Sequence, residues 1–519
     1  MKLCKINSLY IVLICALVMT AAGCKKWLVD QDNDPSNLAP DDFYTLPGHA
    51  DAAIAAAYDR TRFFANGAGI FANNFSMLEM PTGTARTETG QNTDLNNLLG
   101  LSYNGDNVFV LNWWTSLYQV IAQTNLVLDR VPAIKMDDVQ KKKVLGEAQF
   151  LRAWSYFYLV RLYGDVPMLT TSILKVQDPM TYAGRMVKDS VYMQIVTDLK
   201  DAEASGLPWT DASGRASMGA VKSLLAEVYL TMAGYPLDKK APYYQMAADK
   251  ANEVITSGKF ALFGDYNSLH DESKENMGEQ IFEIQFLSGV ANNGNQAILL
   301  PNFKEISAYG TEVGSTTPAT QFVNSFEAGD KRTIDRQGFF YTSYYDGGFD
   351  TLKQLGAPYI YKHFDIGANG TFGSKGTANS GLNWMNIRYA QVLLTYAEAQ
   401  NEAGAGPNQN ALDALKSIRD RAGLATGTLG SYTQTTFRDA VLSERWHELC
   451  YEGVTWFDMV RLRKAYNESN KSFEAFEGHK FPDGVTTLAK KHLLFPLPTL
   501  EMQNNPKLRP QNDGYPGVN

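Results

Sequence analysis

Cysteine is scarce in this sequence, and the few that are present cannot cross-link a folded body. Of the four cysteines, Cys4 and Cys15 lie in an apolar leader, and Cys24 stands directly after it. Only Cys450 remains, and a lone cysteine cannot form an intramolecular disulfide. Core packing must therefore hold the fold together, and we expect Cys450 to be a small buried apolar residue in a helix.

Basic clusters and histidine clusters are also missing. The 519 residues carry a formal net charge of −8 and include six histidines. A mildly acidic chain without a basic patch is atypical of nucleic-acid-binding proteins. His447-Glu448 would need a second histidine at position 451 to form a helical zinc motif, and Tyr451 stands there. We predict no nucleic-acid partner, no metal site and no cofactor.

The N-terminus has the pattern of an export signal. The apolar run 9–19 spans 11 residues, against the roughly 20 that a membrane-crossing helix needs. Lys2 and Lys5 precede the run and small residues at 21–23 follow it, as in a cleaved signal peptide. The next residue, Cys24, resembles the acylated cysteine of a bacterial lipobox.

We therefore predict a signal peptide at residues 1–23, a lipid attached to Cys24 and a polar tether at residues 24–42. The alternative is ordinary secretion, in which Cys24 would be incidental. In both cases the chain is exported, and the folded body begins after the tether.

Apolar residues at helical spacing indicate a mainly α fold. Helices are expected at residues 41–63, 113–131, 139–163, 186–205, 217–233, 243–257, 387–400, 408–421 and 436–466. Residues 279–286 alternate between apolar and polar side chains, which is typical of a strand. The fold class we predict is a helical scaffold with minor β structure.

Two of these stretches have the residue pattern of a tetratricopeptide repeat. Trp114 and Leu117 lie on one helix, and Ala148, Ala153 and Phe157 lie on the next, with a proline after it. Small residues let two helices approach, and large ones fill the space beside them. We predict a tetratricopeptide-like scaffold of about four helix-hairpin units.

Two long irregular blocks, residues 64–108 and 288–382, interrupt the helical pattern. Loops of this length in a compact protein are usually functional or disordered, and their many aromatic residues argue against disorder. Aromatic rings can cover the C–H faces of a sugar, while amides and acids pair with its hydroxyl groups. We predict that both blocks lie on one face of the scaffold and bind a ligand through Tyr103, Asn104, Asp106, Tyr341, Tyr344 and Tyr345. The alternative is that the aromatic residues anchor the loops to the helices.

Several runs resemble the SusD/RagB family of surface lipoproteins from Bacteroidetes-type bacteria. In the C-terminal half they are IRYAQVLLTYAEA, LKSIRDRAGL and ERWHELCYEGVTWFDMVRL, and in the N-terminal half KVLGEAQFLRAWSYFYLVRLYGDVP and the helix after GRAS. HLLFPLPTLEMQNNP and QNDGY resemble the family's closing motif. These motifs stand in the family's order along nearly the whole chain, which divides it into an N-terminal region at 43–270 and a C-terminal region at 271–519.

The resemblance implies a surface-exposed, lipid-anchored protein of the outer membrane that binds an oligosaccharide or similar nutrient. It implies a SusC-type, TonB-dependent transporter as the partner, and binding without catalysis. One alternative is a surface glycoside hydrolase, which would need two carboxylates flanking the bond, for example among Glu79, Glu88, Asp94 and Asp106. The other is a structural subunit of the uptake complex that binds no ligand.

Overall fold

Long helices packed side by side form the body of the protein. The computed structural model describes residues 43–69, 71–173, 182–301, 313–345, 351–374 and 380–518. The predicted leader, Cys24 and the tether therefore lie outside the described residues. The long helices are α3 (Pro47–Thr61), α6 (Val108–Arg130), α7 (Asp138–Tyr163), α8 (Lys188–Ala204), α9 (Met218–Ala233), α10 (Ala241–Thr256), α14 (Tyr389–Ala403), α15 (Gln409–Arg421), α16 (Gln434–Glu448) and α17 (Thr455–Leu462).

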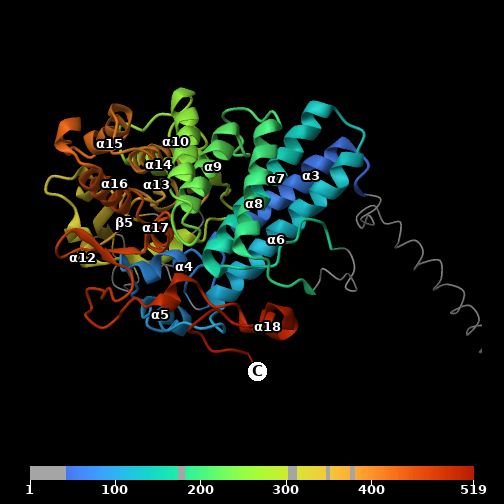
Figure 1. The fold of residues 1–519 in the computed structure, drawn as a ribbon. Helices are drawn as coiled ribbons and strands as arrows, with labels where there is room; N and C mark the ends of the chain where they lie inside the picture. The colour runs from blue at the N-terminus through green and yellow to red at the C-terminus, as the bar shows by residue number, and fades with distance from the viewer. Residues whose placement is uncertain are drawn as a thin grey trace, which may run out of the picture.

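The helices pack in an order that follows the chain. α3 packs on α6, and from α6 to α10 each helix packs on the one that follows it in the chain. α10 packs on α14, and α14 packs on both α15 and α16. Figure 1 shows these helices as a row across the molecule, from α3 and α6 on one side to α15 and α16 on the other. The predicted mainly α architecture is confirmed.

Shorter elements lie along one edge of this row and within the two irregular blocks. The short helices are α4 (Ser76–Glu79), α5 (Thr93–Leu99), α11 (Asn295–Leu299), α12 (Thr320–Ser325), α13 (Ile366–Asn369) and α18 (Thr499–Asn504). The strands are β1 (Ala85–Arg86), β2 (Gln280–Ile284), β3 (Thr317–Pro318), β4 (Phe340–Tyr345), β5 (Leu352–Ile360), β6 (Trp384–Arg388), β7 (Lys464–Asn467) and β8 (Ser472–Ala475). The strands form antiparallel pairs: β1 with β3, β2 with β6, β4 with β5, and β7 with β8.

One predicted helix is two. Residues 436–466 were expected to be continuous, but α16 ends at Glu448 and α17 begins at Thr455. Between them Tyr451 and Gly453 both have positive φ, and a Cβ at Gly453 would lie 2.8 Å from the Leu78 side chain. The backbone turns here to pack against α4, so the single-helix prediction was wrong. Cys450 lies in this turn, just past α16, and is fully buried as predicted.

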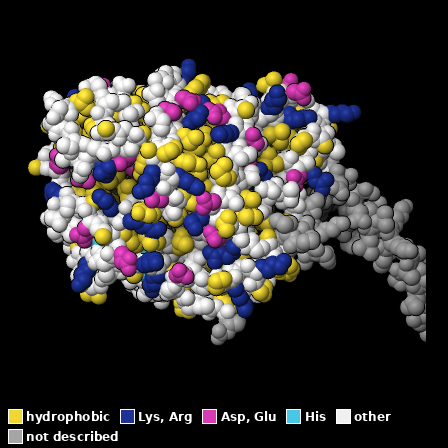
Figure 2. Space-filling model, in the orientation of Figure 1, with side chains coloured by type: hydrophobic (Ala, Val, Ile, Leu, Met, Phe, Trp, Pro, Cys, Tyr) yellow, Lys and Arg dark blue, Asp and Glu magenta, His cyan; other side chains and the backbone are white. Residues whose placement is uncertain are grey.

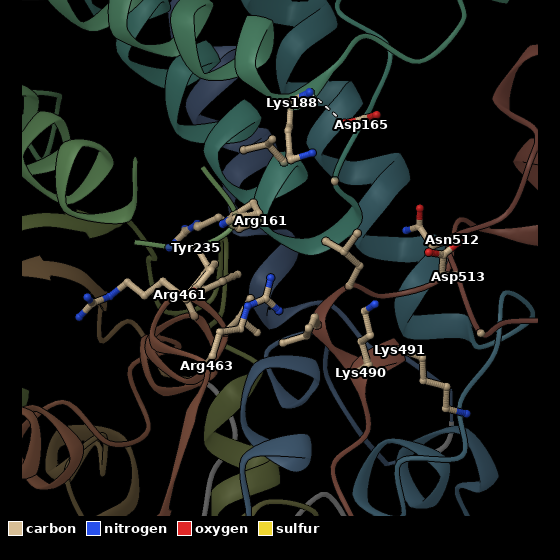
Figure 3. A pocket seen from close by; sticks show the side chains of 18 of the residues that line it. Arg161, Asp165, Lys188, Tyr235, Arg461, Arg463, Lys490, Lys491, Asn512 and Asp513 are labelled. Atoms are coloured by element: carbon tan, nitrogen blue, oxygen red, sulfur yellow. Dashed lines mark hydrogen bonds between the residues drawn. The ribbon is translucent and has the colours of Figure 1, made fainter. Parts of the chain in front are cut away.

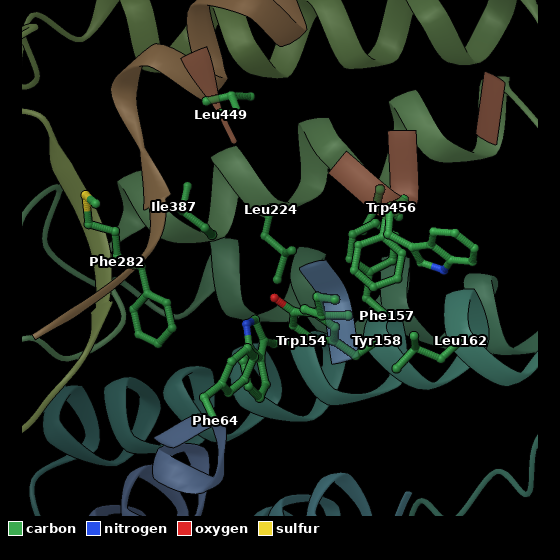
Figure 4. Packing of buried hydrophobic residues seen from close by; sticks show 14 of the residues in the cluster. Phe64, Trp154, Phe157, Tyr158, Leu162, Leu224, Phe282, Ile387, Leu449 and Trp456 are labelled. Carbon is green, nitrogen blue, oxygen red and sulfur yellow. The ribbon is translucent and has the colours of Figure 1, made fainter. Parts of the chain in front are cut away.

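The large core runs through the whole row of helices. Figure 4 shows Trp154 of α7 with Phe64 and Leu224 approaching from different elements. The rings of Phe64 and Trp154 are 5.7 Å apart, and Ala153 beside them is fully buried. A second, smaller cluster lies around the β4–β5 hairpin and contains Leu300, Tyr341, Tyr344, Leu355, Tyr359, Tyr361 and Phe364. Satellite clusters of this kind are usual beneath long loops.

The surface is unevenly charged. Although the formal net charge of the chain is −8, Figure 2 shows Lys and Arg side chains gathered across the middle of the face in view. Among the described residues no helix is both long enough and apolar enough to cross a membrane.

Candidate functional site

The two irregular blocks meet through their backbones and side chains. Ala85 of β1 pairs with Pro318 of β3, and the Arg86 Nε donates to the Pro318 carbonyl at 3.2 Å. The Tyr359 hydroxyl donates to Glu88 Oε1 at 2.6 Å. Segments far apart in sequence are thus in direct contact, as predicted for these two blocks.

The first group of predicted ligand residues lies just before α6. Tyr103 is 2% exposed and its ring stacks on Phe495 with a centroid distance of 4.9 Å. Asn104 and Asp106 are exposed, and the Asn104 Oδ1 accepts a hydrogen bond from the Asp106 backbone N at 2.9 Å. This turn is fixed from the other side because the Thr499 backbone N donates to the Gly105 carbonyl.

The second group lies on strand β4. Tyr341 and Tyr344 are 0% and 1% exposed and belong to the small hairpin cluster. Tyr345 is partly exposed, and its ring meets Phe372 edge-on at 6.2 Å. The backbone of Gly373 makes room for Tyr344, because a Cβ there would lie 2.1 Å from the phenol ring.

The structure does not bring these two groups into one aromatic cluster. Tyr103 packs in the large core against the C-terminal segment, whereas Tyr341 and Tyr344 pack in the small hairpin core. In this arrangement the rings of these three residues serve as anchors, because the irregular blocks must bury apolar area to stay on the scaffold. Asn104, Asp106 and Tyr345 remain open to solvent, and their contact with a ligand stays a prediction.

Sequence reasoning named Glu88 only as a possible hydrolase carboxylate and missed its pairing with Arg86 at the junction. Arg86 and Glu88 lie 3.6 Å apart with side chains 34% and 14% exposed. The neighbouring strand β5 adds an exposed segment, Leu352–Gln354, and β3 packs against β5. The alternating Thr-Ala-Arg-Thr-Glu run at 84–88 was the available signal. A guanidinium and a carboxylate that are both partly exposed suit pairing with the hydroxyls of a sugar, while the buried Tyr359 holds Glu88 in place.

The His447-Glu448 pair is structural. His447 is buried, and its Nε2 lies 2.9 Å from Ser325 Oγ while its Nδ1 lies 2.8 Å from the Ser443 carbonyl. Burial lowers the pKa of His447 to about 3. In the part of the chain that the structure describes, no group of His, Cys, Asp and Glu could hold a metal ion.

Glu444, Arg445 and Glu448 share α16 with His447, and all three are buried. Each forms ion pairs with residues of other elements. Glu448 receives hydrogen bonds from Arg332 at 3.0 Å and Arg388 at 2.9 Å. Burial alone would raise the pKa of Glu448, but the guanidinium groups around it lower that pKa to about 2.

This buried network ties the second irregular block to the scaffold. Arg332 comes from that block, Arg388 from the end of β6, and Arg421 from the end of α15. All three contact Glu448 on α16. Lys362, also from the block, bonds Glu452 and the carbonyls of Glu448 and Cys450. The motif residues therefore position the block and are closed to a ligand.

A large cavity lies elsewhere, between the helices and the C-terminal segment. It has a volume of about 530 Å³ and is walled by the ends of α7 and α9, the start of α8, α17 and residues 490–514. Figure 3 shows Arg161, Tyr235, Arg461 and Arg463 on one side of it and Lys490, Lys491, Asn512 and Asp513 on the other.

Comparison with known proteins gives the family of this fold. The family model described as "SusD family" matches residues 304–515, and the one described as "Starch-binding associating with outer membrane" matches residues 68–230. A SusD superfamily protein from Parabacteroides distasonis has a solved structure that is 38% identical to this chain. The match covers 90% of this chain and 98% of that one, with a TM-score of 0.84. The chain belongs to the SusD/RagB family.

More distant relatives extend the comparison. SusD-like protein P2 from Formosa agariphila is 26% identical over 98% of this chain and 99% of its own length. A laminarin-binding SusD-like protein of known structure is 23% identical, with a TM-score of 0.71, and covers 91% of this chain and 100% of its own. At that identity the second match shows a shared fold.

Proposed function

We propose that this protein binds an oligosaccharide at the cell surface and passes it, without cleaving it, to a TonB-dependent transporter of the outer membrane. Family membership supports the proposal, as does the glycan named for one structural neighbour, laminarin. The description of the N-terminal family model adds starch binding and the outer membrane.

The observation that carries the proposal is the junction of the two irregular blocks. Arg86, Glu88 and Tyr359 meet there, and the buried network around Glu448 and Glu452 ties the second block to the scaffold through Arg332 and Lys362. A rigid scaffold that positions loops with charged and aromatic groups is the usual construction of a binding site. The ligand would contact Arg86 and Glu88 at the junction, with Asn104, Asp106 and Tyr345 as further candidates.

Anchoring and assembly complete the proposal. Residues 1–23 would be removed as a signal peptide, Cys24 would carry the lipid, and residues 24–42 would form the tether. The regions 43–270 and 271–519 would act as one body, since α10 packs directly on α14. The transporter would be a SusC-type β-barrel, over which this protein would act as a lid.

A glycan panel tests the binding step. Residues 25–519 are immobilised and exposed to neutral and acidic oligosaccharides, and the products are analysed after prolonged incubation. We expect saturable binding of at least one glycan, which is recovered intact. Cleavage of the bound glycan would favour the hydrolase alternative, and binding of none would contradict the proposal. Co-purification of the lipidated protein with a transporter tests the second step.

A further inference from the structure

The 530 Å³ cavity has an unusual balance of charge. Its lining includes seven basic side chains and two acidic ones. The basic residues are Arg161, Arg185, Lys188, Arg461, Arg463, Lys490 and Lys491, and the acidic residues are Asp165 and Asp513. In a chain of net charge −8 this concentration of positive charge calls for a physical account.

Most of these cations have no carboxylate partner. Arg461 forms salt bridges with Glu398 and Asp458, so its charge is already satisfied. Within the described residues, none of the other six lies within 4.0 Å of a carboxylate. The Asp165 Oδ1 accepts a hydrogen bond from the backbone N of Lys188 at 2.9 Å, which Figure 3 marks with a dashed line.

Two of the guanidinium groups are held in fixed positions. Arg161 lies between the rings of Phe157 and Phe457, at 3.6 and 3.7 Å from their centroids. Arg185 is held by the carbonyls of Asp165 and Pro510 and by the Asn512 side chain. Burial lowers the pKa of both arginines, and the more distant carboxylates, Asp165 for Arg185 and Glu227 and Asp458 for Arg161, offset this only in part.

Arg463 is the group best placed to bind a ligand. It has a positive φ of 55° at the end of α17, and its guanidinium lies 5.1 Å from the centroid of the Tyr235 ring. Its Nη1 is buried and has no hydrogen-bond partner within the described structure. A buried donor without a partner is destabilising, and an anion in the cavity would supply the missing acceptor.

The rest of the lining defines the body of the ligand. Tyr235, Pro236, Phe457, Leu493 and Leu494 offer apolar surface. The Gln511 side chain already bonds the backbone N and carbonyl of Leu497, and the Asn512 Oδ1 already accepts a hydrogen bond from Arg185. A cavity of this volume falls in the usual range for small organic ligands, about 300–1,000 Å³, and is far larger than an inorganic ion requires.

We propose that this cavity is a second ligand site that takes an acidic sugar, one whose ring carries a carboxylate or sulfate group. The oxyanion would pair with Arg463 and the neighbouring cations, because a planar guanidinium matches a carboxylate or sulfate with two parallel hydrogen bonds. The ring would lie on the apolar wall that Tyr235 and Pro236 form. This site is separate from the Arg86–Glu88 junction, so it does not depend on the function proposed there.

Isothermal titration of residues 25–519 tests the inference. The probes are trigalacturonate, a sulfated disaccharide, a neutral galactose trisaccharide, inorganic sulfate and glycerol phosphate. We expect an acidic sugar to bind and the neutral trisaccharide to bind at least tenfold more weakly at this site. Affinity should fall as salt is raised, because the contact is ionic. Tighter binding of glycerol phosphate than of either acidic sugar would overturn the sugar assignment in favour of a phosphate headgroup.

Variants place the binding in the cavity. Arg463→Gln and Lys188→Gln should each weaken the acidic sugar at least fivefold, while Arg438→Gln, which alters a distant ion pair with Glu402, should leave it unchanged. Thermal melting checks that each variant is folded. If Arg463→Gln does not fold, Lys188→Gln alone tests whether the sugar binds in the cavity. Binding that neither cavity variant weakens, or no binding of either acidic sugar, would overturn the proposal.

Discussion

The Tyr359 hydroxyl donates a 2.6 Å hydrogen bond to Glu88, and this bond joins two segments that are far apart in the sequence. Glu88 belongs to the first irregular block and Tyr359 to the second. The bond sits beside the β1–β3 pair, so the contact between the blocks has both a backbone and a side-chain part. The geometry of the proposed glycan surface depends on this contact.

Tyr359→Phe should loosen the junction. A hydrogen bond to a charged group contributes about 1.5–3 kcal/mol, and the Glu88 carboxylate would lose its phenol partner. We expect the free energy of unfolding to fall by that amount and glycan affinity to fall with it. Chemical denaturation and titration measure the two effects. Tyr389→Phe, which removes a hydroxyl outside both blocks, is the control, and equal effects of the two variants would contradict the role of the junction.

The buried arginine network should be the most sensitive part of the scaffold. Arg388→Met would leave Glu279, Glu448 and Glu452 short of a counter-charge, and breaking a buried ion pair typically costs about 3–5 kcal/mol. Arg438→Met removes a partly exposed pair on the same helix as Glu448 and should cost about 1 kcal/mol or less. Denaturant titration compares the two, and similar losses would show that the network does not hold the second block.

Glu283 should make stability depend on pH in an unusual direction. Burial raises the pKa of Glu283 to about 8. Its folded pKa lies above its unfolded value, so its contribution is full below about pH 4.5 and is lost as pH rises toward 8. Near pH 8 the native protein bears the cost of ionising a buried carboxyl group. Glu283→Gln removes that cost and should therefore raise the melting temperature relative to the native protein at pH 8. At pH 4 the two proteins should melt alike, and a pH-independent difference would contradict the raised pKa.

Anchoring can be tested apart from folding. Cys24→Ala should abolish incorporation of a fatty-acid analogue and move the protein out of the membrane fraction. Its melting temperature should not change, because the described core begins well after residue 24. Unchanged labelling of the variant would show that Cys24 is not the lipidated residue.

The helices could be predicted from sequence because their apolar residues repeat at helical spacing over many turns. The break between α16 and α17 could not, since apolar residues continue through Leu449 and Val454 and only Gly453 indicates a turn. The last two residues of β6, Ile387 and Arg388, were likewise assigned to the helix at 387–400, because the apolar pattern of that helix continues back into the strand.

The candidate site was predictable as a meeting of two blocks but not residue by residue. Composition shows that a loop contains aromatic rings, and it does not show which side of the loop they occupy. The partners of Tyr103, Phe495 and Tyr515, come from the opposite end of the chain. Those of Tyr341 come from the folded-back strand β5, whose register no local pattern reveals. Arg86 and Glu88 lie in an alternating run, but nothing in that run shows that the second block meets it there.

The surface around Arg86 and Glu88 should bind a glycan without cleaving it. The most direct measurement is titration of the glycan found by the panel against the native protein and the double variant Arg86→Ala/Glu88→Gln, with Lys416→Ala/Asp420→Asn as the control. We predict at least tenfold weaker binding by the double variant, native affinity in the control, and intact glycan throughout. Native affinity in the double variant, with both proteins folded, would contradict the account.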